Sequence, residues 1–194
     1  MYSSLDKIDV LAEKDGAWFA VQTDHRTAAE IAAEPEISVL FAIARLHNAA
    51  VTLAQQGHPD GRLRYAVTDD APAFLREAVA ASGAQLESMA APTVTDLGAG
   101  SADQANALVD QSFGALATRV LTRIGTSDLL SALRTLEAET TAGPPDRKQD
   151  EAGYFTRILE LSAVCGEVLR TRSDGRWIQH DQPLVPFGFR IDRG

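Results

Sequence analysis

Residues 35–55, PEISVLFAIARLHNAAVTLAQ, are the segment that decides how the first half of the chain folds. Pro35 suits the first turn of a helix and Gly57 suits its stop, so the segment predicts one long helix. Its apolar residues fall on two stripes, one formed by Ile37, Leu40, Phe41 and Ala44 and the other by Val39, Ile43 and Leu46. A helix that is apolar around so much of its circumference is typically sandwiched in a core.

Strands are expected on both sides of this helix in the sequence. KIDVLAE (7–13) and AWFAVQT (17–23) flank the turn KDG and predict a β-hairpin, and the capping-box spacing of Thr27 and Glu30 predicts a short helix after it. The remaining elements are a strand at 63–68, a capped helix at 69–83 that ends at Gly83, and a strand at 84–90. The order β-β-α-β-α-β predicts an α+β layer unit over residues 1–92, with two helices on one face of a sheet.

The second half of the chain has a mainly helical pattern. Apolar residues recur at helical spacing over 102–125, 128–140 and 151–172, and Ser127 or Thr126 is expected to cap the second of these helices. Strands at 176–180 and 184–192 follow and predict a hairpin. Residues 98–194 are therefore expected to form a helical α-α-α-β-β domain, which makes the whole chain an α+β protein of two domains.

The expected core of this second domain is partly aromatic. The inner stripe of the helix at 151–172 is expected to consist of Phe155, Ile158, Leu159, Cys165 and Leu169. Because two strands are not stable alone in water, Trp177, Phe187 and Phe189 are expected to join Phe155 and Leu159 in one core. Cys165 is expected to be a small buried side chain within that stripe.

Charge and composition restrict the classes of partner. Residues 1–97 hold 14 acidic and 7 basic residues, a net charge of −7, whereas residues 98–194 hold 13 and 11, a net charge of −2. Such an acidic chain is expected to repel nucleic acid. The longest apolar run, residues 39–44, is far shorter than the ~20 residues that cross a membrane. A single cysteine and an acidic N-terminus without a secretory pattern indicate the cytoplasm.

The stretch TVTDLGAGSAD, residues 93–103, resembles the loop that receives S-adenosylmethionine in Rossmann-like methyltransferases. Gly98 and Gly100 would let the backbone approach a cofactor closely, but that chemistry needs an acid at the end of a following strand. Two consecutive helices are expected there instead, over residues 102–140. The stretch is therefore interpreted as an interdomain linker, and no cofactor is expected.

Other catalytic patterns are weak. The four histidines lack zinc-ligand spacing, so no metal is expected, although HPD (58–60) with DD (69–70) leaves a surface cation site as the alternative. No nucleophile elbow and no phosphate loop occurs. TDHR (23–26) places an acid, an imidazole and a guanidinium at a strand end, where functional residues often lie. Asp24, His25 and Arg26 are therefore the candidate binding residues, with helix capping and surface charge as the structural alternative.

Two segments resemble bacterial proteins of unknown function. LDKIDVLAEKDGAWFAVQTDHR followed by ISVLFAIARLHNA resembles an uncharacterised bacterial domain family in which an IDV strand, a DG turn and a strand ending in DH precede a long helix. GEVLRTRSDGRWI is similar to a pattern in which a helix ending GEVL leads through a glycine turn to a strand beginning RW. The resemblance implies the order of elements but no activity.

Two classes of function follow from these observations. The first is a non-enzymatic interaction protein, immunity-like, whose acidic first half contacts a basic protein partner while the second half serves as scaffold or as a homodimer contact. The second is a small-ligand-binding protein or an enzyme with a pocket between the two lobes near Asp24, His25 and Arg26. The lack of a catalytic pattern in the sequence favours the first.

The linker interpretation of residues 93–103 predicts that the protein does not bind S-adenosylmethionine. The acid that would hold the ribose hydroxyls and the sheet that would carry it are both missing from the expected order of elements. Isothermal titration with S-adenosylmethionine should give no heat of binding. A dissociation constant of about a micromolar, as enzymes commonly show for their substrates, would overturn the interpretation.

Overall fold

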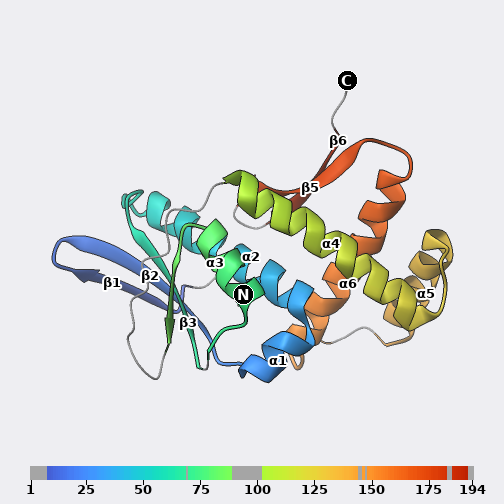
Figure 1. Cartoon of the computed structure of the whole chain (residues 1–194), viewed down its shortest axis with the longest axis horizontal. Helices are drawn as coiled ribbons and strands as arrows, with labels where there is room; N and C mark the ends of the chain where they lie inside the picture. The colour runs from blue at the N-terminus through green and yellow to red at the C-terminus, as the bar shows by residue number, and fades with distance from the viewer. Residues whose placement is uncertain are drawn as a thin grey trace. The chain divides into compact units, whose positions relative to one another are not determined.

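The computed structural model describes residues 8–68, 70–88, 102–143, 146, 148–182 and 185–191. The chain divides into two compact units, which we call unit 1 (Met1–Leu108 and Gln179–Gly188) and unit 2 (Val109–Ile178 and Phe189–Gly194). The boundary predicted between residues 92 and 98, and most of the 93–103 stretch with its two glycines, lie outside the described residues. Mixed helices and strands establish the predicted α+β class (Figure 1).

Unit 1 contains a four-stranded sheet with helices between its parallel strands. Its sheet order is β1-β2-β3-β4, in which β1 runs antiparallel to β2 while β2, β3 and β4 are parallel. The elements are β1 (Val10–Lys14), β2 (Ala17–Asp24), α1 (Ala28–Ala33), α2 (Pro35–Gln55), β3 (Arg62–Val67), α3 (Ala73–Ala81) and β4 (Gln85–Ser88). Parallel neighbours need crossover connections, which α2 and α3 supply. The predicted order is therefore confirmed, with α1 as the short helix expected from its capping box.

The hairpin of β1 and β2 turns through two residues. Asp15 and Gly16 both have positive φ, 54° and 76°, which a two-residue hairpin turn of the favoured twist requires. Lys14 pairs with Ala17 directly beside this turn. The predicted turn is thus confirmed.

Helix α2 is the central helix of unit 1. It begins at Pro35, ends at Gln55, and is followed by Gly57 with a φ of 86°, as predicted. Of the helices in the described chain, it alone is long and apolar enough to cross a membrane, yet 61% of its apolar window is buried inside the protein. It packs against β2, β3 and α3. This packing accounts for an apolar composition around most of its circumference.

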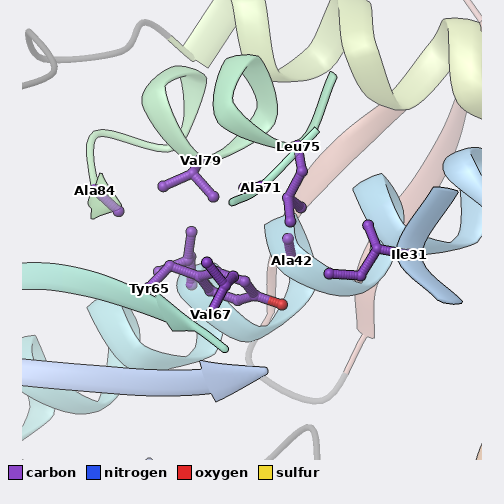
Figure 2. Packing of buried hydrophobic residues seen from close by; sticks show 9 residues of the cluster. Ile31, Ala42, Tyr65, Val67, Ala71, Leu75, Val79 and Ala84 are labelled. Atoms are coloured by element: carbon purple, nitrogen blue, oxygen red, sulfur yellow. The ribbon is translucent and has the colours of Figure 1, made fainter. Parts of the chain in front are cut away.

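The main core of unit 1 lies between the sheet and these helices. Figure 2 shows its buried side chains, contributed by the α1–α2 region, by β3 and by α3. The cluster consists of Ile31, Ala42, Leu46, Tyr65, Val67, Ala71, Leu75, Val79 and Ala84. A second cluster of Ala20, Ala49 and Leu53 joins β2 to α2. Both clusters use the same face of the sheet, so the predicted one-sided layer is correct.

One helix start differs from the sequence expectation. The helix predicted from residue 69 begins at Ala73, after Pro72, and no side chain caps it. Proline lacks a backbone N–H and forces the preceding residue toward an extended conformation, so the helix cannot extend back through residue 71. The expected capped start is therefore wrong.

The other face of the sheet carries aromatic and basic side chains. The guanidinium of Arg64 lies 4.2 Å from the centre of the Phe19 ring, and Arg62 lies 5.8 Å from it. Arg64 in turn donates to Glu87 of β4 over 2.6 Å. These cation–π contacts explain why Phe19 is buried on a face that the crossover helices do not cover.

Three helices and part of a hairpin build unit 2. The elements are α4 (Ala102–Ile124), α5 (Leu129–Ala142), α6 (Glu151–Arg170), β5 (Gly175–Gln182) and β6 (Val185–Ile191), of which α4, β5 and β6 are shared with unit 1. Gly125, with a φ of 78°, ends α4 as predicted. The cap of α5 is Asp128, whose carboxylate accepts from Ser131 N, and not Ser127 or Thr126. Thr126 instead accepts the N–H of Asp128 itself.

Aromatic stacking and ion pairs hold unit 2 together. Trp177 of β5 is buried and stacks on Phe113 of α4 at 3.8 Å, and Phe189 of β6 meets Trp177 edge-on at 5.5 Å. Arg170 donates two hydrogen bonds to Asp110, which also accepts the backbone N–H of Trp177. Trp177 is thus a core residue, as predicted, but the ring stacked on it is Phe113 of α4, which was not among the partners expected from α6. Phe187 and Phe189 are half-buried.

The predicted inner stripe of α6 is partly wrong. Ile158 and Leu169 are 39% and 44% exposed, and Cys165 is exposed too. The buried residues of α6 are Ala163, Val164 and Gly166, while Phe155 and Leu159 are half-buried. A β-carbon on Gly166 would lie 2.5 Å from the Trp177 ring, so only the smallest residue fits there. The small residues therefore face inward, whereas Ile158 and Leu169 do not.

This contact predicts opposite effects for two helical Gly→Ala changes. Alanine is normally favoured over glycine inside a helix by about 1 kcal/mol. Gly166→Ala should nevertheless destabilise the protein by about 1–3 kcal/mol, because overpacking against the stacked Trp177 ring outweighs the helix preference. Gly114→Ala in α4 is the matched control, because its nearest neighbour would be 3.9 Å away, and it should stabilise. Urea unfolding measures both, and a stabilised Gly166→Ala would contradict the packing.

Candidate functional site

The predicted site residues lie where β2 ends. Asp24 is the last residue of β2 and pairs in register with Val67, the last residue of the parallel strand β3. Its side chain is on the same face as Ala20, which packs on α2, and it is only 3% exposed. A carboxylate buried to this extent needs hydrogen-bond donors around it.

Asp24 receives those donors from two neighbours. Arg26 donates through Nε to Oδ1 over 2.9 Å and through Nη2 to Oδ2 over 2.7 Å, and its backbone N–H adds a third bond to Oδ1. The hydroxyl of Tyr65 donates to Oδ2 over 2.9 Å. Figure 2 shows the Tyr65 ring beside Val67, with its hydroxyl oxygen on the side of the core where Ala42 and Ile31 lie. We call Asp24, Arg26, Tyr65 and Ser38 the Asp24 cluster.

Ser38 extends the cluster to helix α2. Arg26 Nη1 donates to Ser38 Oγ over 3.0 Å, and Ser38 Oγ donates to the carbonyl of Ile31. The carbonyl of Arg26 accepts from Thr68 after β3. The cluster therefore connects the ends of β2 and β3 with the first turn of α2.

The charges of the cluster are fixed by these contacts. Burial raises the pKa of the Asp24 carboxyl, but the hydrogen bonds and charge of Arg26 outweigh it and hold that pKa below its ordinary value. Burial, followed by the negative charge of Asp24, raises the pKa of the Tyr65 hydroxyl. Burial lowers the pKa of Arg26, but Asp24 more than restores it. At neutral pH the cluster is thus an ionised Asp–Arg pair with a neutral tyrosine.

His25 does not join the cluster. Its side chain is exposed, and its Nε2 lies 3.4 Å from Thr23 Oγ1. Adjacent residues at the end of a strand point to opposite faces, which separates the imidazole from the carboxylate of Asp24. The structure therefore brings two of the three predicted residues, Asp24 and Arg26, together and leaves the third apart.

A second ion pair, between Arg45 of α2 and Asp9, also contacts the end of β2. Arg45 donates to the carbonyl of Thr23 over 2.8 Å and to Asp9 Oδ2 over 2.7 Å, and Asp9 also accepts from the N–H and hydroxyl of Thr23. The guanidiniums of Arg26 and Arg45 lie 5.6 and 5.3 Å from the ring centre of Phe41. Phe41 is thus flanked by both cations.

Sequence reasoning missed Ser38, Arg45, Tyr65 and Asp9. Two of them carried a signal, because Ser38 and Arg45 are the polar residues within the apolar run 37–46. A polar residue on a buried helix face needs a partner, and that requirement indicates a second polar group across the core. Tyr65 and Asp9 gave no such signal, because tyrosines and acids are common in exposed strands and loops.

The other groups considered in the sequence, His58 and Cys165, lie outside the Asp24 cluster. His58 of the HPD turn stacks on the Trp18 ring at 4.1 Å, which is a packing role. Partial burial raises the pKa of the Cys165 thiol, which disfavours the reactive thiolate. Within the part of the chain that the structure describes, no group of three His, Cys, Asp or Glu side chains is arranged to hold a metal ion.

A cavity of about 240 Å³ lies elsewhere in unit 1. Leu46 and Leu63 form part of its apolar lining, and His47, Ser82 and Gln179 supply its polar groups. Asp24, His25 and Arg26 do not line this cavity.

Comparisons with known proteins add no assignment. No family model matches the sequence, and no match was found among curated proteins or among solved structures. The resemblance of the N-terminal and C-terminal segments to uncharacterised bacterial proteins therefore rests on those segments alone.

The Asp24 cluster predicts a specific loss of stability when its charge is removed. Asp24→Asn should lower the free energy of unfolding by about 2–4 kcal/mol, because Arg26 loses its charge partner in a largely buried site. Asp70→Asn, at an exposed position, is the control and should change it by less than about 0.5 kcal/mol. Chemical denaturation at pH 7 measures both.

The sign of the pH dependence follows from the lowered pKa of Asp24. Its contribution to stability is complete above the ordinary carboxyl pKa of 3.8 and is lost as the pH falls through the lower folded-state value. The difference in unfolding free energy between wild type and Asp24→Asn should therefore shrink below about pH 4. A difference that stays constant down to about pH 2 would show that Asp24 is not held as an ion pair.

Proposed function

We propose that the protein is a non-enzymatic binding module that recognises a basic protein through the acidic surface of unit 1. The proposal rests on the observation that three arginines of unit 1 are already paired with acidic side chains of the same unit. Arg26, Arg45 and Arg64 form ion pairs inside the unit, with Asp24, Asp9 and Glu87 respectively. Because these positive charges are compensated within the fold, other residues set the field that a partner meets.

Those other residues are mostly acidic. The exposed basic residues in the described part of unit 1 between residues 8 and 88 are Lys14, Arg62 and Arg76. The exposed acidic residues that take no part in those three ion pairs are Glu13, Asp15, Glu30, Asp60, Asp70 and Glu77. An excess of one sign accelerates encounter with a partner of the opposite sign and selects against partners of the same sign. Neutralising or escorting a basic protein, as an immunity protein does, is the form of binding that we favour.

The chemistry of the Asp24 cluster supports binding over catalysis. A general base needs an accessible lone pair within reach of a substrate proton. Both oxygens of Asp24 already accept two hydrogen bonds each, and the carboxylate is almost completely buried. Its ion pair with Arg26 makes proton uptake by Asp24 less favourable still. The cluster therefore fits a role in holding β2, β3 and α2 together.

Small-ligand binding is the second candidate, and the cavity lined by Leu46, His47 and Gln179 favours it. Its volume of about 240 Å³ is just below the range of about 300–1,000 Å³ that is usual for ligand sites. An apolar lining with a few polar groups suits a small, largely apolar molecule. Native mass spectrometry of the purified protein tests this candidate. A small molecule that co-purifies with the wild type and is lost in the His47→Leu variant would support it over the first.

The binding proposal predicts a salt-sensitive partner that depends on unit 1. The full-length protein should capture a basic protein from lysate at low salt and release it as salt rises, because ions screen exposed charges. Asp60→Asn, Asp70→Asn and Glu77→Gln together should abolish this capture. The matched control is the unit 2 set Glu137→Gln, Asp146→Asn and Asp174→Asn, which removes the same charge and should leave capture unchanged.

Two results would contradict the proposal. The first is capture that persists in the unit 1 variant, and the second is capture by the wild type that does not depend on salt. Either result would show that the exposed acids of unit 1 do not form the contact.

A further inference from the structure

Helix α6 carries a stripe of apolar residues with coiled-coil spacing. Starting at residue 154, apolar side chains recur at alternating intervals of four and three residues, which is the heptad pattern of helices that pair along their length. The stripe, which we call the α6 seam, consists of Tyr154, Ile158, Leu161, Cys165 and Val168, with Leu169 beside it. Glu151, the first residue of α6, precedes Ile158 by seven residues and continues the stripe, and Arg172 lies in the turn that follows the last helical residue, Arg170.

The seam is on the side of α6 that faces away from its contacts with α4 and with Trp177. Helix α5 packs beside the seam, where Arg157 of α6 pairs with Glu139 of α5 over 2.7 Å. The contacts with α4 and Trp177 come from the opposite face. Glu160 pairs with Arg123 of α4 over 3.1 Å, Gly166 lies against Trp177, and Arg170 pairs with Asp110 over 2.6 Å. On the seam itself, Ile158 is 39% exposed, Leu169 is 44% exposed and Cys165 is exposed. A heptad stripe of large apolar residues is therefore left partly open to solvent.

The two ends of the seam have opposite charge. At the start of α6, Asp150 and Glu151 outweigh the nearby Lys148 and leave a negative charge. Beyond its end, Arg172 and Arg176 outweigh Asp174 and leave a positive charge. A second copy of the helix in antiparallel orientation would set the acidic end of each copy beside the basic end of the other. A parallel copy would set like charges together, which is unfavourable. The seam is thus complementary to itself in one orientation.

We propose that the α6 seam binds a second copy of this chain, with the two α6 helices antiparallel. The interface is isologous, because the same stripe on each copy contacts its counterpart about a two-fold axis. Glu151 of each copy lies near Arg172 of the other, and the apolar seam residues pack between these charged ends. This pairing uses residues of unit 2 alone. Its test is therefore independent of the test of the acidic binding surface of unit 1.

The size of the seam sets the expected affinity. A helix of 20 residues is about 30 Å long. Stable protein–protein interfaces begin at about 1,200 Å² of buried surface, and one pair of helices of this length buries less surface than that. The dimer should therefore be weak and reversible. We expect a dissociation constant of about 1–100 µM, which corresponds to association free energies of about −5 to −8 kcal/mol.

Sedimentation velocity of the full-length protein over a concentration series tests the pairing. The wild type should shift from monomer to dimer as its concentration rises to about 200 µM. Ile158→Glu, which places a charge in the middle of the seam, should weaken association at least about tenfold. Leu130→Glu on α5 is the matched control, because Leu130 is 42% exposed and outside the seam, and it should leave association unchanged. A wild type that stays monomeric, or an equal loss in both variants, would overturn the proposal.

A charge exchange tests the antiparallel orientation. Glu151→Arg and Arg172→Glu should each weaken the dimer, because each brings like charges together at both ends of the seam. The double variant restores opposite charges and should recover association. Both changes also oppose the dipole of α6, and the double variant carries both penalties, so recovery cannot come from a more stable helix. Failure of the double variant to recover association, while its melting shows that it is folded, would overturn the antiparallel pairing.

Discussion

The ion pair between Asp24 and Arg26 is the constraint on which the sheet end of unit 1 depends. A carboxylate that is 3% exposed persists as an anion only when donors surround it, and four hydrogen bonds from Arg26 and Tyr65 do so. Those bonds fix where β2 ends relative to β3, and Ser38 carries the same network to α2. Asp24 and Arg26, two of the three residues predicted as a binding site, therefore serve to hold the fold together.

Periodic apolar patterns made most of the fold predictable. Residues 35–55 specified a buried helix because Pro35, Gly57 and two apolar stripes agree, and the Asp15–Gly16 turn specified the hairpin. Predictions that depended on contacts across the fold were less successful. Three residues of the stripe on α6, Ile158, Cys165 and Leu169, were wrongly assigned to the buried face, because a sequence pattern cannot show that Trp177 requires the small Gly166 beside it. Local chemistry decides element boundaries, whereas the packing partner decides which face is buried.

The candidate site, too, depends on contacts across the fold that the sequence pattern could not show. Asp24, His25 and Arg26 are adjacent in the sequence, but strand alternation separates His25 from the other two. Partners of Asp24 come from residues 38 and 65, and no local pattern joins those positions to residue 24. The polar residues within an apolar helix, Ser38 and Arg45, were the available signal. Their partners became identifiable only when the crossover from β2 to β3 brought them together.

The two proposals use the chain's charge and apolar surface in different ways. Unit 1 compensates three of its arginines internally, which leaves an excess of acidic side chains among its exposed charged residues. Unit 2 spreads ion pairs such as Arg123–Glu139 and Arg157–Glu139 between its own helices and leaves the α6 seam partly exposed.

A double-mutant cycle on Asp24 and Arg26 tests most directly whether this pair is a structural ion pair. Asp24→Ala, Arg26→Ala and the double variant are compared with the wild type by the free energy of urea unfolding at pH 7. The structure predicts a coupling free energy of about 2–3 kcal/mol, because each single change leaves the other charge without its partner. A coupling below about 0.5 kcal/mol, with the two effects simply additive, would contradict the claim that this pair holds the end of β2 in place.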